Sequence, residues 1–185
     1  MPVVVSLLRG VNVGGNRKMK MDSLRELYES LGMRGARTYI QSGNVVSHSA
    51  KGAGAAESNR IEKAIEQAFG FRPDVVLRTR EQLHDIVKAT PFATRPELAT
   101  NKILVHFLKA EPAPQAAQTV SRIPAKEELH LIGRELFVYY PDGAGQSKLS
   151  PSALDKALRT PATGRNWNTV LKLLEMADSL YATGV

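Results

Sequence analysis

The chain has 185 residues, of which 43% are hydrophobic and 23% charged, a composition typical of a globular protein with a sizeable core. It contains no cysteine, which excludes disulfides, thiolate-bound zinc, iron–sulfur clusters and thiol nucleophiles. No apolar run reaches the roughly 18 residues needed to span a bilayer. The N-terminus also lacks the basic segment of a signal peptide. We therefore expect a cytoplasmic protein without a membrane partner.

Basic residues are in excess and unevenly distributed. The net charge is +7. Residues 1–40 hold seven Lys and Arg against three Asp and Glu, and residues 145–172 hold five against one, so each segment carries +4. A basic balance favours an anionic partner, and two basic segments that meet in space would focus their field on one cleft.

The first half of the chain alternates short apolar runs with helical periodicity. Leu24, Leu27, Tyr28 and Leu31 have the spacing of one helix face, and Gly32 is placed to end that helix. A turn at 41–44 separates two strand-like runs. The predicted order is ferredoxin-like, βαββαβ, with strands at 3–8, 36–40, 45–48 and 74–77 and helices at 21–31 and 61–68.

The second half repeats this pattern with different endings. Thr79 and Gln82 are spaced as a capping box, and Ser150 followed by Pro151 predicts another helix start. After the first of these helices the order is βαββαα, with strands at 101–108, 128–132 and 135–139 and helices at 112–120, from 151, and at 168–181. We expect an α+β fold with a ferredoxin-like subdomain at 1–79 and a second small α+β subdomain at 80–185.

A glycine-rich segment follows the first strand and precedes the first helix. Glycines there let backbone N–H groups approach an anion, and Arg9 and Lys18 would add charge. The pattern of Gly10, Asn12, Gly14 and Gly15 matches neither a Rossmann nor a Walker fingerprint. Two interpretations stay open: a ligand loop, or a tight connection in which glycines permit the turn.

A second donor-rich cluster lies before the last predicted helix. Arg165, Asn166 and Asn168 place a guanidinium and two amides at one helix start. Capping by Asn explains part of this motif, and Trp167 fits either a core anchor or a stacking surface. Lys148 is interpreted as a phosphate contact rather than a base for Ser147. The turn at Ser42 and Asn44 also has a purely structural explanation.

Four motifs in this order resemble the domain-of-unknown-function family 1697, which is widespread in bacteria. They are residues 7–15, 38–45, 147–149 and 163–169. The resemblance implies an α+β fold with a ferredoxin-like N-terminal part, and it implies no activity, substrate or cofactor. One departure is Ser47, where relatives often carry an aromatic or apolar residue, so a local packing contact is in question.

We expect one polar site in a cleft between the two halves that binds a small phosphorylated or carboxylated ligand. A nucleic-acid module and an interaction protein without a ligand are the alternatives, with nucleic acid not favoured. Neither the reaction, the cofactor nor the oligomeric state follows from the sequence, and the scattered His residues predict no metal site. The expected ligand-binding residues are Arg9, Asn12, Gly14, Gly15, Lys18, Ser42, Asn44, Lys148, Arg165, Asn166 and Asn168.

Overall fold

A computed structural model describes residues 1–184, and these fall into two compact units. Unit 1 comprises Met1–His84 together with the chain from Lys172 onward, and unit 2 comprises Asp85–Leu171. Each unit contains a four-stranded antiparallel sheet. No helix within residues 1–184 is both long enough and apolar enough to cross a membrane.

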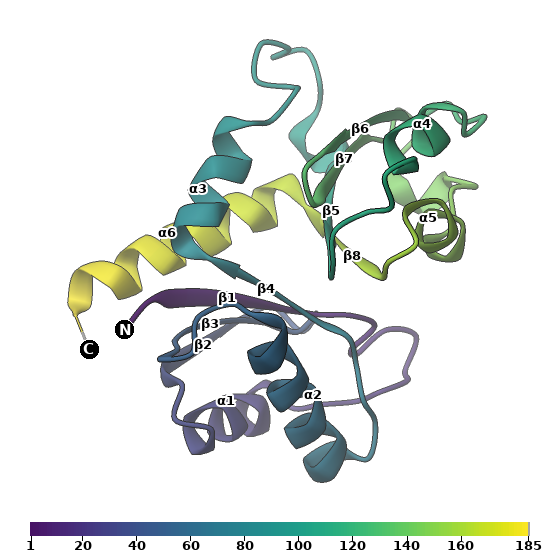
Figure 1. Ribbon diagram of the computed structural model, residues 1–185. Coiled ribbons are helices and arrows are strands. Elements are labelled where there is room, and N and C mark those ends of the chain that lie inside the picture. The colour runs from purple at the N-terminus through teal and green to yellow at the C-terminus, as the bar shows by residue number, and fades with distance from the viewer. Residues whose placement is uncertain (185) are drawn as a thin grey trace. The chain divides into compact units, whose positions relative to one another are not determined.

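Unit 1 has the ferredoxin-like order that the sequence predicts. Its sheet runs β2-β3-β1-β4, and α1 and α2 cover one face of it (Figure 1). Glu29 Oε1 accepts a hydrogen bond from the N–H of Ala36 at 2.8 Å, which ties α1 to β2. The elements are β1 (Val3–Leu8), α1 (Met21–Ser30), β2 (Arg34–Tyr39), β3 (Asn44–His48), α2 (Ala55–Phe69) and β4 (Val75–Thr79).

The core of unit 1 forms where the helices meet the sheet. Alternate residues of the strands point to this face, where Val4, Leu8 and Val45 pack with Leu24 and Tyr28 of α1. The core also includes Ile61 and Ile65 of α2 and Val75 and Leu77 of β4. All of β1 and β3 is buried, and β1 is apolar on both faces apart from Ser6, whereas β3 buries Asn44, Ser47 and His48 beside its two valines.

Ser47 lies in this buried sheet opposite Val4 in the β1–β3 ladder. Its hydroxyl has no hydrogen-bond partner among the residues described. A buried hydroxyl that is left unpaired costs free energy, so we expect Ser47→Ala to raise the free energy of unfolding by about 1 kcal/mol. Urea denaturation followed by circular dichroism measures this change. Ser30→Ala, at an exposed helix end, is the control and should change stability by less than about 0.5 kcal/mol; a loss of stability in Ser47→Ala alone would contradict the prediction.

Unit 2 contains a strand, β8, that the sequence analysis did not separate from the start of the last helix. Its sheet runs β6-β7-β5-β8, and α4 and α5 lie on one face (Figure 1). The order is therefore βαββαβ followed by a helix, rather than βαββαα. The elements are α3 (Arg80–Lys88), β5 (Ile103–Leu108), α4 (Ala116–Ser121), β6 (Glu128–Ile132), β7 (Glu135–Tyr139), α5 (Pro151–Leu158), β8 (Ala162–Asn166) and α6 (Trp167–Thr183). Helix α3 begins in unit 1, and α6 ends in unit 1. Short 3-10 turns lie at Thr100–Lys102 and Ala144–Gln146.

The two sheets share one ladder register, so the units are structural repeats. In each, the third residue of the first strand pairs with the fourth residue of the last strand: Val5 with Arg78, and Val105 with Arg165. Both arginines are buried. The pairing with β5 holds residues 162–166 as a strand even though Gly164 and Asn166 are of residue types that are depleted in strands.

The predicted helix starts are confirmed by their capping bonds. Thr79 and Gln82 form a reciprocal box, with backbone-to-side-chain distances of 2.9 and 3.2 Å. Ser150 Oγ accepts the N–H of Ala153 at 3.2 Å, with Pro151 in the first turn. Near its end, α6 packs on unit 1, where Asp178 accepts a 2.6 Å bond from Arg80 Nε.

Candidate functional site

The glycine-rich segment of unit 1 folds as a miniature hairpin. Asn16 N–H donates to Val13 O at 3.1 Å, and Asn12 N–H donates to Arg17 O at 3.2 Å. Gly14 and Gly15 occupy the turn with φ of 58° and 78°, the pattern of a two-residue hairpin loop that glycine favours. The turn is exposed, and Lys18 is also exposed beyond it.

Asn12 uses its side-chain amide inside the protein. Its Nδ2 donates to Met19 O at 3.0 Å and to Gln41 O at 2.8 Å, and its Oδ1 accepts the N–H of Met19 at 2.7 Å. These bonds close the hairpin and join it to the turn after β2. The amide that the sequence offered as a ligand donor therefore has a structural role.

Ser42 and Asn44 also serve the turn between β2 and β3. Asn44 is fully buried, and its Nδ2 donates to Tyr39 O at 3.0 Å and to Ser42 Oγ at 2.9 Å. Arg9 is half-buried at the end of β1, where its N–H donates to Asp74 O at 2.9 Å. The structure thus brings the first two sequence motifs together around one pair of turns in unit 1.

The second donor cluster lies in unit 2, where Asn166 and Trp167 have structural roles. Asn166 Oδ1 accepts the N–H of Asn168 at 3.0 Å and caps α6, and its Nδ2 donates to Asn101 O at 2.8 Å. Trp167 is buried, as a core anchor requires, and Asn168 is exposed. The predicted capping at this helix start is therefore confirmed.

Arg165 is buried in β8 rather than exposed at the helix start. Its Nη1 donates to Thr163 Oγ1 at 2.7 Å and to Gly164 O at 2.9 Å. Burial disfavours the charged guanidinium and lowers the pKa of Arg165 to about 10. Arg165 is therefore not a solvated side chain.

His106 lies beside β8 on the helix-covered face of the sheet. It pairs with Gly164, where a Cβ would approach its ring to 3.0 Å, so the ring occupies space that only glycine leaves open. His106 Nε2 lies 3.0 Å from Tyr140 Oη. Burial and the Arg165 charge lower the pKa of His106 to about 4, and burial together with Glu127 raises that of Tyr140 to about 12. The imidazole is therefore neutral near pH 7.

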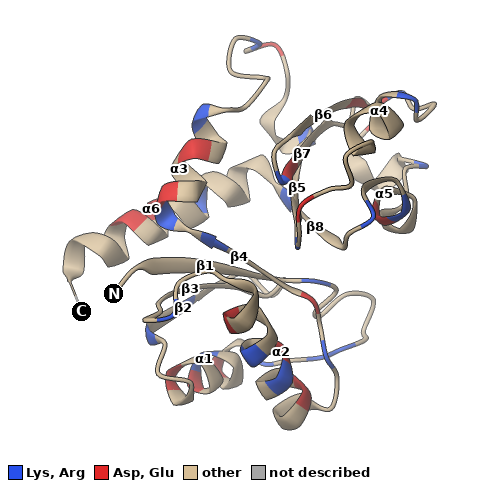
Figure 2. Ribbon diagram, in the orientation of Figure 1, with Lys and Arg blue, Asp and Glu red and all other residues tan. Residues whose placement is uncertain are grey.

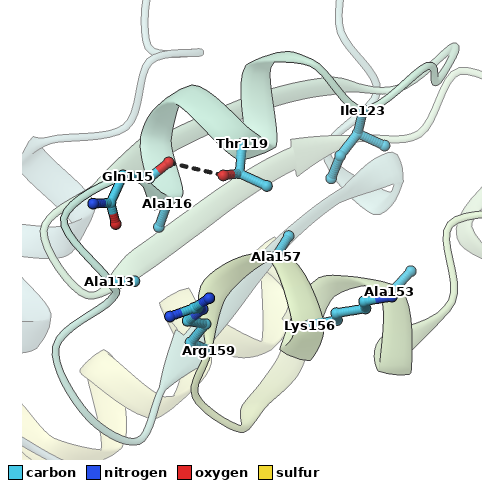
Figure 3. A pocket seen from close by; sticks show the side chains of 9 residues that line it. All are labelled: Ala113, Gln115, Ala116, Thr119, Ile123, Ala153, Lys156, Ala157 and Arg159. Carbon is cyan, nitrogen blue, oxygen red and sulfur yellow. Dashed lines mark hydrogen bonds between the residues drawn. The ribbon is translucent and has the colours of Figure 1, made fainter.

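Two adjoining hollows lie beside α4 and α5 in unit 2, and together we call them the cationic groove. The first, of about 560 Å³, lies between α4 and α5 (Figure 3). The second, of about 410 Å³, continues past Ile123 and Ala153, which line both. The groove is lined by Ala113, Gln115, Ala116, Thr119, Ile123, Pro124, Ala125, Lys126, Glu127, Asp142, Gln146, Lys148, Leu149, Ala153, Lys156, Ala157 and Arg159.

Cations border a mostly apolar floor in this groove. Figure 3 shows Arg159 just after α5, with Ala113, Ala116 and Ala157 among the other lining residues. Among residues 1–184, no ion-pair partner faces Lys148, Lys156 or Arg159. Lys126, in contrast, pairs with Asp142 at 3.4 Å. Three uncompensated cations beside a concave apolar surface are the features that an anionic ligand requires.

Ser147 positions Glu127, an acidic residue that lines the groove. Its hydroxyl donates to Glu127 at 2.5 Å and accepts the N–H of Leu149 at 3.0 Å. Ser147 thus orders the segment that carries Lys148. Ser147 therefore serves the turn, and the role of Lys148 as a phosphate contact stays a prediction.

Of the predicted site residues, Lys148 lines the cationic groove, and its partners Lys156 and Arg159 were not predicted. Their only signal in the sequence was that Lys156 and Arg159 lie in the basic segment 145–172. The convergence of the unit 1 and unit 2 residues on one cleft stays a prediction. Across residues 1–184, no three His, Asp or Glu side chains gather as metal ligands would.

Comparisons with known proteins support the fold and leave the activity open. The model of the family described as "Protein of unknown function (DUF1697)" matches residues 1–137. The chain is also similar to the solved structure of the conserved bacterial protein SP0830 from Streptococcus pneumoniae. That likeness has 24% identity and a TM-score of 0.70, and it covers 96% of this chain and 99% of the other. No curated protein matches this chain.

Proposed function

The chain belongs to the DUF1697 family, and because that description names no activity, we propose from the groove alone that the protein binds a small anionic ligand. The ligand is phosphorylated or carboxylated and carries an apolar part. Its anionic group pairs with Lys156 and Arg159, and its apolar part rests on the alanines between α4 and α5. Lys148 contacts the portion that extends past Ile123.

The observation that carries this proposal is the placement of unpaired cations beside a concave apolar floor. A lysine exposed on a flat surface is well solvated and gains little from an ion pair. An exposed lysine by itself therefore does not indicate a binding site. At a hollow of about 560 Å³, however, an anion can contact Lys156 and Arg159 together while its apolar part leaves water. Charge-assisted bonds of this kind are about twice as strong as neutral ones.

Arg159 has a backbone conformation that makes it a specific element of the groove. It follows α5 with φ of 55°, a left-handed conformation that asparagine or glycine adopts at lower cost. The arginine at this position lines the hollow (Figure 3). The strained position therefore supports a ligand contact for this side chain.

Phenyl phosphate, which combines an anionic group with an apolar ring, is a suitable probe. We expect it to shift the amide resonances of Ala113, Ala116 and Ala157 in a two-dimensional NMR titration. Lys156→Gln and Arg159→Asn should each weaken binding about tenfold, the effect of losing one charge-assisted contact. Asparagine is chosen at Arg159 because it tolerates the left-handed backbone.

The controls distinguish binding in the groove from attraction of the anion to the positive charge of the whole protein. Lys63→Gln, at an exposed lysine of α2 in unit 1, should bind phenyl phosphate as the wild type does. Inorganic phosphate should bind more weakly than phenyl phosphate, since it leaves the apolar floor uncovered. Unchanged affinity in Lys156→Gln and Arg159→Asn, or no shift in the groove with phenyl phosphate, would overturn the proposal. Binding of a short oligonucleotide alone, lost at moderate salt, would instead favour the nucleic-acid alternative.

A further inference from the structure

Ile40 has the least expected conformation in unit 1. It follows β2 with φ of 49°, and its side chain is 52% exposed. A β-branched residue in the left-handed region is strained by about 1–2 kcal/mol. Exposure means that packing does not explain the choice of isoleucine at this turn. Backbone strain at an exposed apolar residue points to a contact of its side chain with another molecule.

The surroundings of Ile40 hold the turn firmly in place. The neighbouring Gln41 carbonyl accepts a 2.8 Å bond from Asn12, and the Asn44 amide donates to Tyr39 O at 3.0 Å. Gly43 lies so close to β1 that a Cβ there would stand 2.8 Å from Leu8 Cβ. These contacts fix the conformation of the turn, so the backbone that carries Ile40 is rigid.

A second exposed apolar residue and several cations adjoin this turn. Val13, next to Asn12 in the hairpin, is 63% exposed. Arg17, Lys18 and Lys20 are exposed on the same connection between β1 and α1, which carries basic residues in Figure 2. The chain has no acidic residue before Asp22, and Asp22 pairs with Arg25. The resulting surface is apolar and positively charged.

We propose that this surface docks an acidic segment of a partner protein that carries a large apolar side chain. We call it the Ile40 surface and define it by Val13, Arg17, Lys18, Lys20 and Ile40. The cations set the charge of the partner, and Ile40 with Val13 provides an apolar contact for its large side chain. Proteins bind single-stranded nucleic acid with cations along its backbone and aromatic side chains that stack on its bases. The aliphatic side chains of Ile40 and Val13 supply neither contact, which favours a protein partner.

A peptide-display selection on the intact protein tests this docking surface. Random dodecapeptides are enriched on the wild type alone, and each enriched peptide is then titrated against the wild type and Ile40→Asn, because asparagine accepts the left-handed backbone at low cost. We expect the enriched peptides to be net acidic and to contain a leucine, phenylalanine or similar residue. Their affinity should fall about tenfold in Ile40→Asn and in Lys18→Glu, while thermal unfolding of Ile40→Asn should occur no lower than in the wild type.

Two variants supply matched controls. Ile132→Asn removes another exposed isoleucine, in the hairpin of unit 2, and Lys156→Gln alters the cationic groove. Both variants should bind the selected peptides as the wild type does. Because Lys156→Gln tests the cationic groove and Ile40→Asn tests the Ile40 surface, failure of the proposed function is distinguished from failure of this docking surface. Peptides that bind Ile40→Asn equally well, peptides without an acidic bias, or preferential binding of a single-stranded oligonucleotide would each overturn the proposal.

Discussion

Replacing Gly43 by alanine is expected to lower the free energy of unfolding by about 3 kcal/mol. Two costs add at this position. Its φ of 74° lies in the left-handed region, where a Cβ is strained, and that Cβ would stand 2.8 Å from Leu8 Cβ and 3.4 Å from Val11 Cβ. Since Leu8 is part of the unit 1 core, the added methyl cannot be accommodated without moving β1 or the turn. Urea denaturation followed by circular dichroism measures the loss.

Gly14→Ala is the matched control for this change. Gly14 has φ of 58°, and no atom lies within 4 Å of where its Cβ would be, so alanine there meets the backbone strain without the collision. We expect a loss of about 1 kcal/mol. Equal losses for the two variants would show that close packing against Leu8 contributes nothing, and would contradict the argument.

The glycine positions illustrate which features of the fold were readable from sequence. The turn at 41–44 and its flanking strands follow from local patterning, because a strand period and a turn glycine involve only neighbours in the chain. The closeness of Gly43 to Leu8 depends on the pairing of β1 with β3. Long-range pairing of this kind leaves no local signal.

The donor-rich motifs illustrate why the site was harder to predict than the fold. Asn12 and Asn44 are amides in glycine-rich turns, and the same residues suit a ligand or a backbone partner. The deciding contact, Asn12 with the Gln41 carbonyl, joins residues 29 apart in the chain. A sequence names the donor but not its partner, so a fold-stabilising amide and a ligand-binding one look alike.

β8 and the cationic groove were missed for related reasons. Residues 162–166 lack the apolar alternation of a strand, and their pairing with β5 imposes the extended form. The groove depends on α4 and α5 lying side by side with small residues between them, as Figure 3 shows. Alanine in a helix is ordinary, and only the tertiary arrangement brings Ala113 and Ala116 together with Ala153 and Ala157 around one hollow.

Acidification from pH 7 to pH 5 is expected to destabilise the protein by about 2 kcal/mol through His106. The pKa of His106 is lowered to about 4 in the folded chain, by burial first and by the Arg165 charge second. In the unfolded chain it returns to about 6.5. At pH 5 the unfolded state therefore holds a proton on this ring that the folded state does not. Stability is full above the unfolded pKa and is lost as the pH falls toward the folded one.

His106→Gln isolates this contribution from the other titrating groups. Glutamine retains a polar side chain near Tyr140 Oη, the partner of the His106 ring, and has no proton to gain in this range. Trp167 is the single tryptophan and lies in unit 2, so its fluorescence reports unfolding there. The wild type should lose about 2 kcal/mol more than His106→Gln between pH 7 and pH 5. Parallel pH profiles for the two proteins would show that the His106 imidazole is solvated in the folded protein, and would contradict the prediction.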